Sequence, residues 1–333
     1  MDLKPLVSVI IPTYGRPTFL KRAIDSARES EDSSLVEVVV VPNGPDESWR
    51  RVAEQFKDAE NVRFLPIATA HANAARNYGL LNAKGSYVRF LDDDDYLFPS
   101  AAHIQVEYLE KTGADVCSGL LLNVDHDETP LGTLGFPDTG DFVCAALSVS
   151  GFTLPTGNLF RRECLQGAHW NTSVNRAQDN VWMLDLAGLR EWNWVHVGEH
   201  VGVWYQHAGP RTSTVRLTVD RPYKLIEAIL NLHERLGKSG RLNRSRQEAI
   251  AEALWRHAHW RFPIQPIYWS SVARKAKKIA PWVGPDHSIF ESPMLRHLDP
   301  LVVEWLMYPL RRIARSYRDA KASLIGWDYR RRL

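Results

Sequence analysis

The feature that most constrains this chain is an apolar run that ends in four consecutive acids. Residues 87–91 read Tyr-Val-Arg-Phe-Leu, and residues 92–95 are all aspartate. β-Branched, aromatic and aliphatic side chains favour a buried strand over 87–91. Four carboxylates at the tip of a strand repel one another, so a bound cation would relieve them. Carboxylate oxygens are hard ligands that suit Mg²⁺ or Mn²⁺. The alternative is an acidic loop or a helix N-terminus, where acids are also favourable.

Strands and helices alternate through the first hundred residues. We predict buried strands over 6–11, 35–41 and 61–65, and helices over 18–29, 48–56 and 71–83. This order predicts an α/β fold with a mostly parallel, Rossmann-like central sheet flanked by helices. Ligands bind beyond the carboxyl ends of such strands, so we expect the tips at 12–16, 42–44 and 92–95 to converge. None of these tips has the dinucleotide-binding glycine pattern or the Walker A pattern, which disfavours both site types.

The remaining sequence continues the alternation and then becomes helical. We predict a helix over 101–111, a strand over 115–123, and an irregular connection over 124–152 with a short helix near 142–147. A strand edge over 157–162, a helix over 178–189 and strands over 194–197 and 201–205 follow. Beyond residue 220 we expect helices that begin at Ser245 with a capping box, then over 267–279 and 301–322, with Pro309 kinking or restarting the last. We therefore predict one domain over 1–220 and a basic helical region over 221–333.

Charge is distributed unevenly along the chain. The net charge is +2, but residues 241–333 hold 18 Lys and Arg against 8 Asp and Glu, so the first 240 residues are acidic. A basic tail on an acidic body suggests that the tail meets an anionic partner. The three cysteines are odd in number and lack metal-type spacing, which fits a reducing cytoplasm. We see no signal-peptide pattern and no apolar run of transmembrane length.

Five segments, taken in order, resemble family-2 glycosyltransferases with the GT-A fold. The resemblance covers residues 6–213. It is carried by 7–14 (Val-Ser-Val-Ile-Ile-Pro-Thr-Tyr), by 75–80, by 90–95 with Pro99, by 157–162 followed by Gln178-Asp179, and by 204–207. Each segment alone is a weak signal, whereas their common order and spacing make a strong one. The resemblance implies a nucleotide-binding half over 1–100 and an acceptor half over 101–220.

The resemblance also implies a donor and a metal. The donor would be a nucleotide-diphosphate sugar, with UDP or TDP favoured, and the family pattern has Asp92 facing the ribose and Asp94 holding Mn²⁺ or Mg²⁺. Asp93 lies between them and would assist, and His207 would complete the metal shell or touch the diphosphate. Asp95 would instead cap the next helix. A divalent ion suits this chemistry because a diphosphate leaving group gains negative charge. The other residues expected to bind the nucleotide are Pro12, Thr13, Tyr14, Arg16, Asn43 and Arg76.

On the acceptor side, the resemblance implies direct displacement with inversion. Asp179 would act as the general base that takes the proton of the attacking hydroxyl. Its alternative role is an acid favoured by the N-terminal end of a helix. Gln178 stands where the family usually has glutamate, and its amide can still orient an acceptor, as can Asn158. The expected acceptor is a glycan or a lipid-linked glycan.

Two departures leave other functions open. Pro42 and Asn43 stand where the family often has two acids that read the base, which leaves uridine against thymidine open and permits guanosine. With Gln178, these departures are compatible with a catalytically silent glycan- or nucleotide-binding protein. A sugar nucleotidyltransferase is a weaker alternative, because residues 12–17 lack the glycine-rich basic loop that it needs.

The C-terminal region lies outside the resemblance. One face of a predicted helix carries Leu306, Leu310, Ile313 and Tyr317, and the other carries Arg311, Arg312, Arg315 and Arg318, with Trp282, Trp305 and Trp327 as aromatic anchors. This pattern suits an anionic membrane surface, with packing on its own domain as the alternative. Nucleic acid is disfavoured, because the body is acidic and no nucleic-acid motif is present. We expect a cytoplasmic protein that can bind the inner face of the cell membrane.

Overall fold

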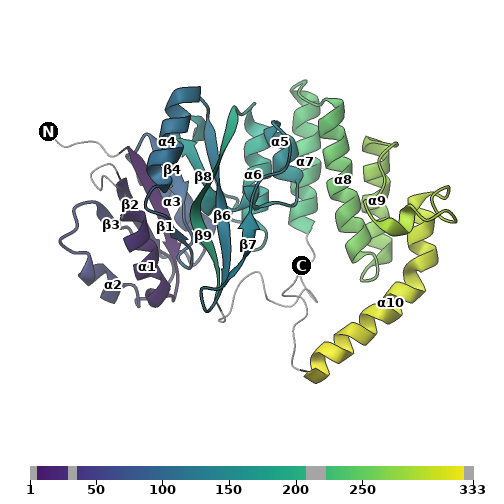
Figure 1. Cartoon of the computed structure of the whole chain (residues 1–333), viewed down its shortest axis with the longest axis horizontal. Helices are drawn as coiled ribbons and strands as arrows, with labels where there is room; N and C mark the ends of the chain where they lie inside the picture. Colours follow the sequence, from purple (N-terminus) through teal and green to yellow (C-terminus); the bar gives the residue numbers. More distant parts are fainter. Residues whose placement is uncertain (1–5, 29–35, 208–222, 326–333) are drawn as a thin grey trace. The chain divides into compact units, whose positions relative to one another are not determined.

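The chain forms two compact units in a computed structural model, which describes residues 6–28, 36–207 and 223–325 (Figure 1). The units divide after Gly209, as Met1–Gly209 and Pro210–Leu333. The predicted boundary near residue 220 lies outside the described residues. Side chains of the last helix are described as far as residue 321.

The first half of the N-terminal unit is a parallel sheet with intervening helices. Strand β1 pairs in parallel with β2 on one side and β4 on the other, and β2 pairs in parallel with β3. The alternation predicted from sequence is therefore confirmed, with boundaries shifted by at most two residues. The elements are β1 (Val7–Thr13), α1 (Pro17–Arg28), β2 (Val36–Pro42), α2 (Arg50–Gln55), β3 (Val62–Phe64), α3 (Ala72–Asn82) and β4 (Tyr87–Phe90).

The second half extends the same sheet with mixed pairing. The strand order is β3-β2-β1-β4-β8-β6-β9-β5, and β7 pairs with β6. Strand β8 is antiparallel to both β4 and β6, whereas β9 is parallel to β6. The elements are β5 (Tyr96–Leu97), α4 (Ala101–Thr112), β6 (Val116–Asp125), β7 (Pro130–Leu134), α5 (Phe142–Leu147), β8 (Asn158–Arg161), α6 (Gln178–Leu189) and β9 (Trp194–Gln206), with short 3₁₀ turns at Gly151–Thr153, Pro155–Gly157 and Arg162–Leu165.

Two sequence expectations in this half are wrong. Residues 124–152 include strand β7. Most of its residues are exposed, and they lack the alternation of apolar and polar residues by which a strand is predicted. The two strands expected over 194–205 are one strand, β9, whose register against β6 shifts near Leu120. Strand β9 runs beside β6, and its C-terminal end places residue 207 near the tip of β4.

Helices cover both faces of the sheet. The face that carries Val7, Val9 and Ile11 packs against apolar residues of α1, α2 and α4. The opposite face packs against α3, and the approach is so close that a methyl group on Gly79 would lie 2.4 Å from Cγ2 of Ile10. Helix α6 contributes Trp182 to this second face, where its ring meets the edge of Phe90. Buried apolar packing on both faces makes the sheet a rigid support for its tips.

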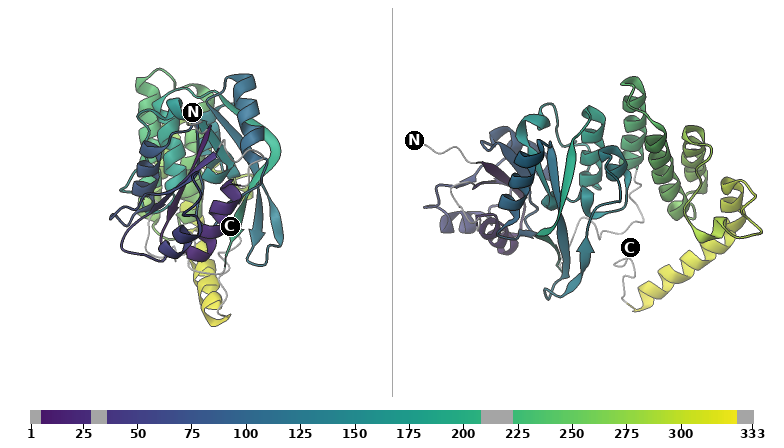
Figure 2. Two further views of the ribbon diagram at one scale, coloured as in Figure 1. Left: turned by 90° about the vertical axis from the view of Figure 1, so that its left-hand side faces the viewer. Right: turned by 45° about the horizontal axis from the view of Figure 1, so that its top comes forward.

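The C-terminal unit is helical, as predicted. Helix α8 contacts both α7 and α9, and the three helices lie side by side in the right-hand view of Figure 2. Helix α8 begins after Asn243, whose side chain accepts the N–H of Arg246, so the predicted capping box at Ser245 is wrong. Helix α10 continues through Pro309 without restarting. The helices are α7 (Tyr223–Lys238), α8 (Arg244–Arg261), α9 (Pro266–Ile279) and α10 (Pro300–Ile325), with a 3₁₀ turn at Ser288–Phe290.

Candidate functional site

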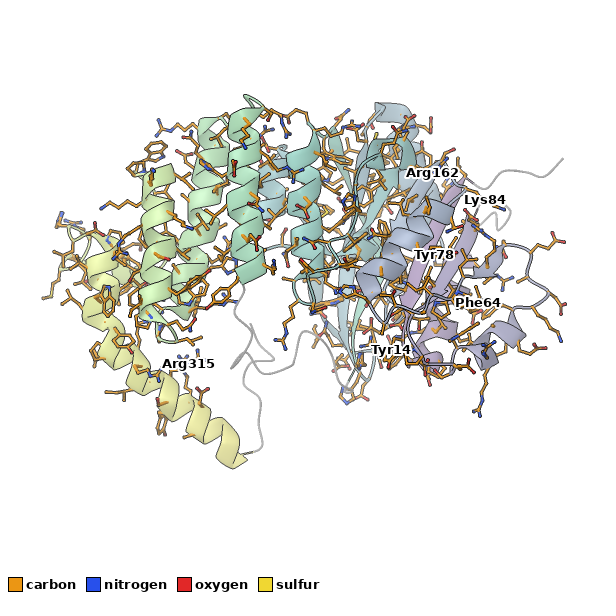
Figure 3. All side chains as sticks on the ribbon, turned by 180° about the vertical axis from the view of Figure 1, so that it is seen from behind. Tyr14, Phe64, Tyr78, Lys84, Arg162 and Arg315 are labelled. Carbon is orange, nitrogen blue, oxygen red and sulfur yellow. The ribbon has the colours of Figure 1, made fainter. Side chains whose placement is uncertain are left out.

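The tips of β1, β2 and β4 meet at the carboxyl edge of the sheet. The backbone N–H of Asn43 donates to the carbonyl of Thr13 at 3.0 Å, and its side-chain amide donates to the same oxygen at 2.8 Å. The Thr13 hydroxyl donates to Oδ2 of Asp93 at 2.7 Å. Figure 3 shows Tyr14 at this edge, with Lys84 and Arg162 at the opposite one. The expected convergence of three tips is therefore present.

Arg16 lies between two of the four aspartates. Its Nη1 donates to Oδ1 of Asp93 at 3.2 Å and to Oδ2 of Asp94 at 2.8 Å. Burial, and then repulsion from Asp94, raises the pKa of Asp93 to about 7, although Arg16 and Thr13 oppose the rise. Burial would lower the pKa of Arg16, but the two carboxylates outweigh it and raise that pKa. Most of this acidic run is thus buried against cationic and polar groups, not held in water.

His207 reaches the same aspartate from the end of β9. Its Nε2 lies 3.1 Å from Oδ2 of Asp94, and its ring packs 5.0 Å from the ring of Phe19. Neighbouring ligands of an octahedral ion bonded at about 2.1 Å are separated by about 3.0 Å. The Asp94–His207 pair fits that spacing, so these two residues suit one edge of a divalent ion. In the described part of the chain, three close ligand residues occur together at Asp125–Asp127, in a largely exposed turn.

Arg76 joins Asp92 to the beginning of α6. Its Nη2 donates to Oδ1 of Asp92 at 2.6 Å, and its Nη1 donates to Oε1 of Gln178 at 3.0 Å and to the side chain of Asn73 at 2.9 Å. The guanidinium is buried and lies 4.4 Å from the centre of the Trp170 ring, a cation–π distance. A single arginine therefore links the predicted donor side to the predicted acceptor side.

Asp179 lies in the first turn of α6 and is half-buried. Its Oδ1 is inaccessible to solvent and has no hydrogen bond. Burial, and then repulsion from Asp92 and Asp94, raises its pKa to about 7, against the attraction of Arg76. Ala177, just before the helix, has a left-handed backbone with φ of +51°. A carboxylate with a pKa near neutrality can accept a proton at physiological pH.

Asp95 does not cap the following helix, so that alternative is wrong. Its Oδ2 accepts the hydroxyl of Thr156 at 2.9 Å, and its Oδ1 accepts the backbone N–H of Tyr205 at 3.0 Å. Ser100 stands at the start of α4. Asp95 instead connects the tip of β4 to the end of β9, two residues before His207.

Three other predicted residues differ in their surroundings. Asn158 is buried, its Oδ1 accepts the hydroxyl of Ser118, and its Nδ2 donates to the carbonyls of Phe152 and Leu154. Its amide is therefore engaged inside the fold and holds the loop that precedes β8, and its acceptor-side role stays a prediction. Pro12 is buried within β1. Tyr14, by contrast, is 53% exposed.

Sequence reasoning missed Arg22 of α1. Its Nη2 donates to the backbone carbonyl of Asp94 at 3.0 Å, and its guanidinium lies 4.4 and 4.2 Å from the ring centres of Tyr96 and Tyr205. Its Nη1 also pairs with Glu128 at 2.6 Å. The partners Asp94 and Glu128 lie 72 and 106 residues away in the sequence, so no local pattern could identify this role.

Comparison with known proteins points to glycosyltransferases. The sequence model of glycosyl transferase family 2 matches residues 8–165. An uncharacterized glycosyltransferase from Rickettsia bellii is 34% identical over 107 residues, which are 32% of this chain and 15% of that protein. The uncharacterized glycosyltransferase EpsJ from Bacillus subtilis is 32% identical over 113 residues, or 34% of this chain and 33% of EpsJ. The matches thus span a third or less of these relatives.

Solved structures show the fold over nearly the whole chain. Residues 1–349 of TarS from S. aureus, in complex with UDP-GlcNAc, superpose with a TM-score of 0.69 at 16% identity, covering 97% of this chain and 93% of that one. The mannosyltransferase PcManGT from Pyrobaculum calidifontis, in complex with GDP-Man and Mn²⁺, has a TM-score of 0.50 at 15% identity, covering 93% and 88%. This chain therefore carries, over residues 8–165, a domain of glycosyltransferase family 2, and its fold is GT-A.

Proposed function

We propose that this protein is a metal-dependent inverting glycosyltransferase, which moves a sugar from a UDP- or TDP-sugar to a hydroxyl of a glycan or glycolipid. The observation that carries the proposal is the array at the strand tips. There Arg16 binds Asp93 and Asp94, and Arg76 binds Asp92. The negative charges of Asp92 and Asp94 help to raise the pKa of Asp179. The residues proposed for the donor site are therefore close enough to the proposed base to change its pKa.

The nucleotide would lie along the tips of β1 and β2. The side-chain NH₂ of Asn43 donates to the Thr13 carbonyl. The side-chain oxygen Oδ1 of Asn43 is therefore the atom that can accept a hydrogen bond from N3–H of uracil or thymine. Tyr14 is exposed beside Gly44, where a base can stack on its ring. Asp92 would accept from the ribose. Binding of UDP-GlcNAc by the similarly folded TarS supports uridine, and GDP-Man on PcManGT keeps guanosine as the alternative.

The diphosphate would be met by cations of the chain and by the ion. Asp94 and His207 would hold Mn²⁺ or Mg²⁺, which neutralises charge on the diphosphate as it leaves. Nη1 of Arg16 lies 2.8 Å from Oδ2 of Asp94 and balances part of the negative charge of that carboxylate. The Mn²⁺ bound to PcManGT supports a divalent ion at this kind of site.

Proton transfer would fall to Asp179. In our proposal its carboxylate takes the proton of the acceptor hydroxyl as that oxygen attacks the anomeric carbon, and the attack displaces the diphosphate with inversion. Gln178, held by Arg76 at 3.0 Å, would orient the acceptor. Because Arg76 also binds Asp92, a substitution of Arg76 would disturb both the donor side and the acceptor side of the proposed site.

The acceptor would be a glycan or a lipid-linked glycan at the cytoplasmic face of a membrane. The exposed apolar and basic residues of the C-terminal unit support this location. In the described residues, no helix is long and apolar enough to cross a bilayer.

The test is a thermal-shift panel with UDP, TDP, GDP and CDP, each with and without Mn²⁺. Ligand binding to the native state raises the melting temperature by mass action. We expect a Mn²⁺-dependent rise with UDP or TDP that Asp94→Ala abolishes. A Mn²⁺-independent rise would contradict the metal role, and no rise with any nucleotide would contradict the donor site. A donor-hydrolysis assay then separates an enzyme from a silent binder.

A further inference from the structure

Helix α10 turns an apolar face away from its own unit. Its buried residues near the N-terminal end include Val303 and Glu304, whereas large apolar residues face solvent. Their exposed fractions rise along the helix, from 48% at Val302 through 58% at Leu306, 61% at Leu310 and 67% at Ile313 to 68% at Tyr317. The spacing of three or four residues places all five on one side. We call this set the α10 stripe.

The N-terminal end of the stripe opens into a groove between α9 and α10. The groove has a volume of about 430 Å³ and is lined by Arg274, Asp299, Leu301, Val302, Trp305 and Leu306. The indole N–H of Trp305 donates to Ser270 at 3.1 Å, which fixes the ring, and 43% of the residue stays exposed. A fixed, partly exposed tryptophan beside an apolar groove is typical of a membrane–water interface.

Cations border the groove and the stripe. Helix α9 exposes Arg274, Lys275, Lys277 and Lys278, and α10 exposes Arg312, Arg318 and Lys321. The acid in the groove, Asp299, is already paired with Lys277. Arg274 and Lys278 are one helical turn apart, so both lie on the groove side of α9. The surface thus combines an apolar centre with a positive rim.

This combination selects one kind of occupant. A second copy would bring its own positive rim against this one, and like charges oppose that contact. A bilayer with anionic headgroups pairs with the rim while its acyl region takes the apolar residues. Every residue from Ser316 to Lys321 is exposed, so no described residue of the unit covers the Tyr317 end of the stripe.

We propose that the α10 stripe and the α9–α10 groove form a docking surface for an anionic phospholipid bilayer, on which α10 lies in the plane of the interface. The inference specifies the membrane contact of the proposed function. It does not depend on catalysis, because its test measures binding in the absence of substrates.

The experiment is co-sedimentation of the full-length protein with phosphatidylcholine vesicles, with and without phosphatidylglycerol, at low and high salt. The first variant is Leu306→Glu with Leu310→Glu. Its matched control is Leu81→Glu with Leu131→Glu, two exposed leucines of the other unit. The second variant is Arg274→Gln with Lys278→Gln. Circular dichroism establishes that each variant retains its helices.

We expect binding to the anionic vesicles that weakens with salt. The Leu306/Leu310 variant should lower the partition coefficient by roughly tenfold or more, because it removes apolar burial, and the control should bind as wild type. The Arg274/Lys278 variant should lose much of the preference for phosphatidylglycerol. Equal sedimentation of all variants, or no sedimentation of the wild type, overturns the proposal. Self-association that the Leu306/Leu310 variant abolishes, without vesicle binding, assigns the stripe to a second copy instead.

Discussion

Each unit contains a buried cluster of charges, and the two clusters are balanced differently. At the strand tips, Asp92, Asp93, Asp94 and Asp179 lie around only two arginines, Arg16 and Arg76, so the acids outnumber these cations. In the C-terminal unit one acid, Glu304, has both oxygens engaged. His259 Nδ1 lies 2.5 Å from its Oε1, Arg311 Nη1 pairs with its Oε2, and Arg311 Nη2 donates to the His259 carbonyl at 2.6 Å.

The difference separates a cluster that needs a ligand from one that supports the fold. The strand-tip acids raise one another's pKa, as Asp93 and Asp179 show, and they can be relieved by an arriving cation. The Glu304 cluster is already satisfied by its neighbours and has no charge left to offer. Burial of charge alone is therefore weak evidence for a site, whereas an excess of one sign, buried at the edge of a sheet, is strong evidence.

The largest expected effect comes from Asp179→Asn. Removing a general base should lower kcat by roughly 10²- to 10⁴-fold while the donor affinity remains unchanged. Steady-state kinetics and nucleotide titration measure the two quantities, with Asp185→Asn in the same helix as the control. If Asp179→Asn retains turnover, Asp179 is not the general base.

Glu304→Gln should act on stability and not on chemistry. It leaves Arg311 beside His259 without a carboxylate, and breaking a buried pair costs about 3 kcal/mol. Urea unfolding measures the loss, and turnover per folded molecule should stay at the wild-type value. An unchanged free energy of unfolding would mean that the balanced cluster is dispensable.

The pH profile of kcat/KM should report the raised pKa of Asp179. A base must be deprotonated to act, so activity should fall about tenfold per pH unit below about pH 7. Because Asp92 and Asp94 contribute to the rise, Asp92→Asn should move this limb to lower pH. A profile that stays flat down to pH 5 would remove the electrostatic argument for the base.

The smallest effect is a rise in melting temperature. The native state raises the Asp179 pKa from 3.8 to about 7, so it favours the protonated form and loses stability as pH rises between those values. Asp179→Asn removes that loss, and its Tm should exceed the wild-type value by a few degrees at pH 8 and by little at pH 4. Differential scanning calorimetry across pH tests this. Glu304→Gln should show the opposite sign.

What could be predicted from the sequence follows from the range of each interaction. The parallel order of β1, β2 and β4 and the convergence of their tips follow from local patterns and one topological rule. Strand β7 could not be found, because its residues are exposed on a hairpin. The contacts of Arg22, Asp95 and Asn158 depend on partners that the fold brings together, so residue type alone missed Arg22 and suggested a helix cap at Asp95 that is absent.

The link from Asp95 to Tyr205 spans 110 residues of sequence. Contacts of such long range are slow to form, because closing a long loop costs entropy before the contact can stabilise the fold. During synthesis the four aspartates leave the ribosome long before β9, and the segment 8–165 that carries the family signature ends before both Asp179 and His207. The proposed metal pair, Asp94 with His207, therefore cannot be complete in the nascent protein until β9 has joined the sheet.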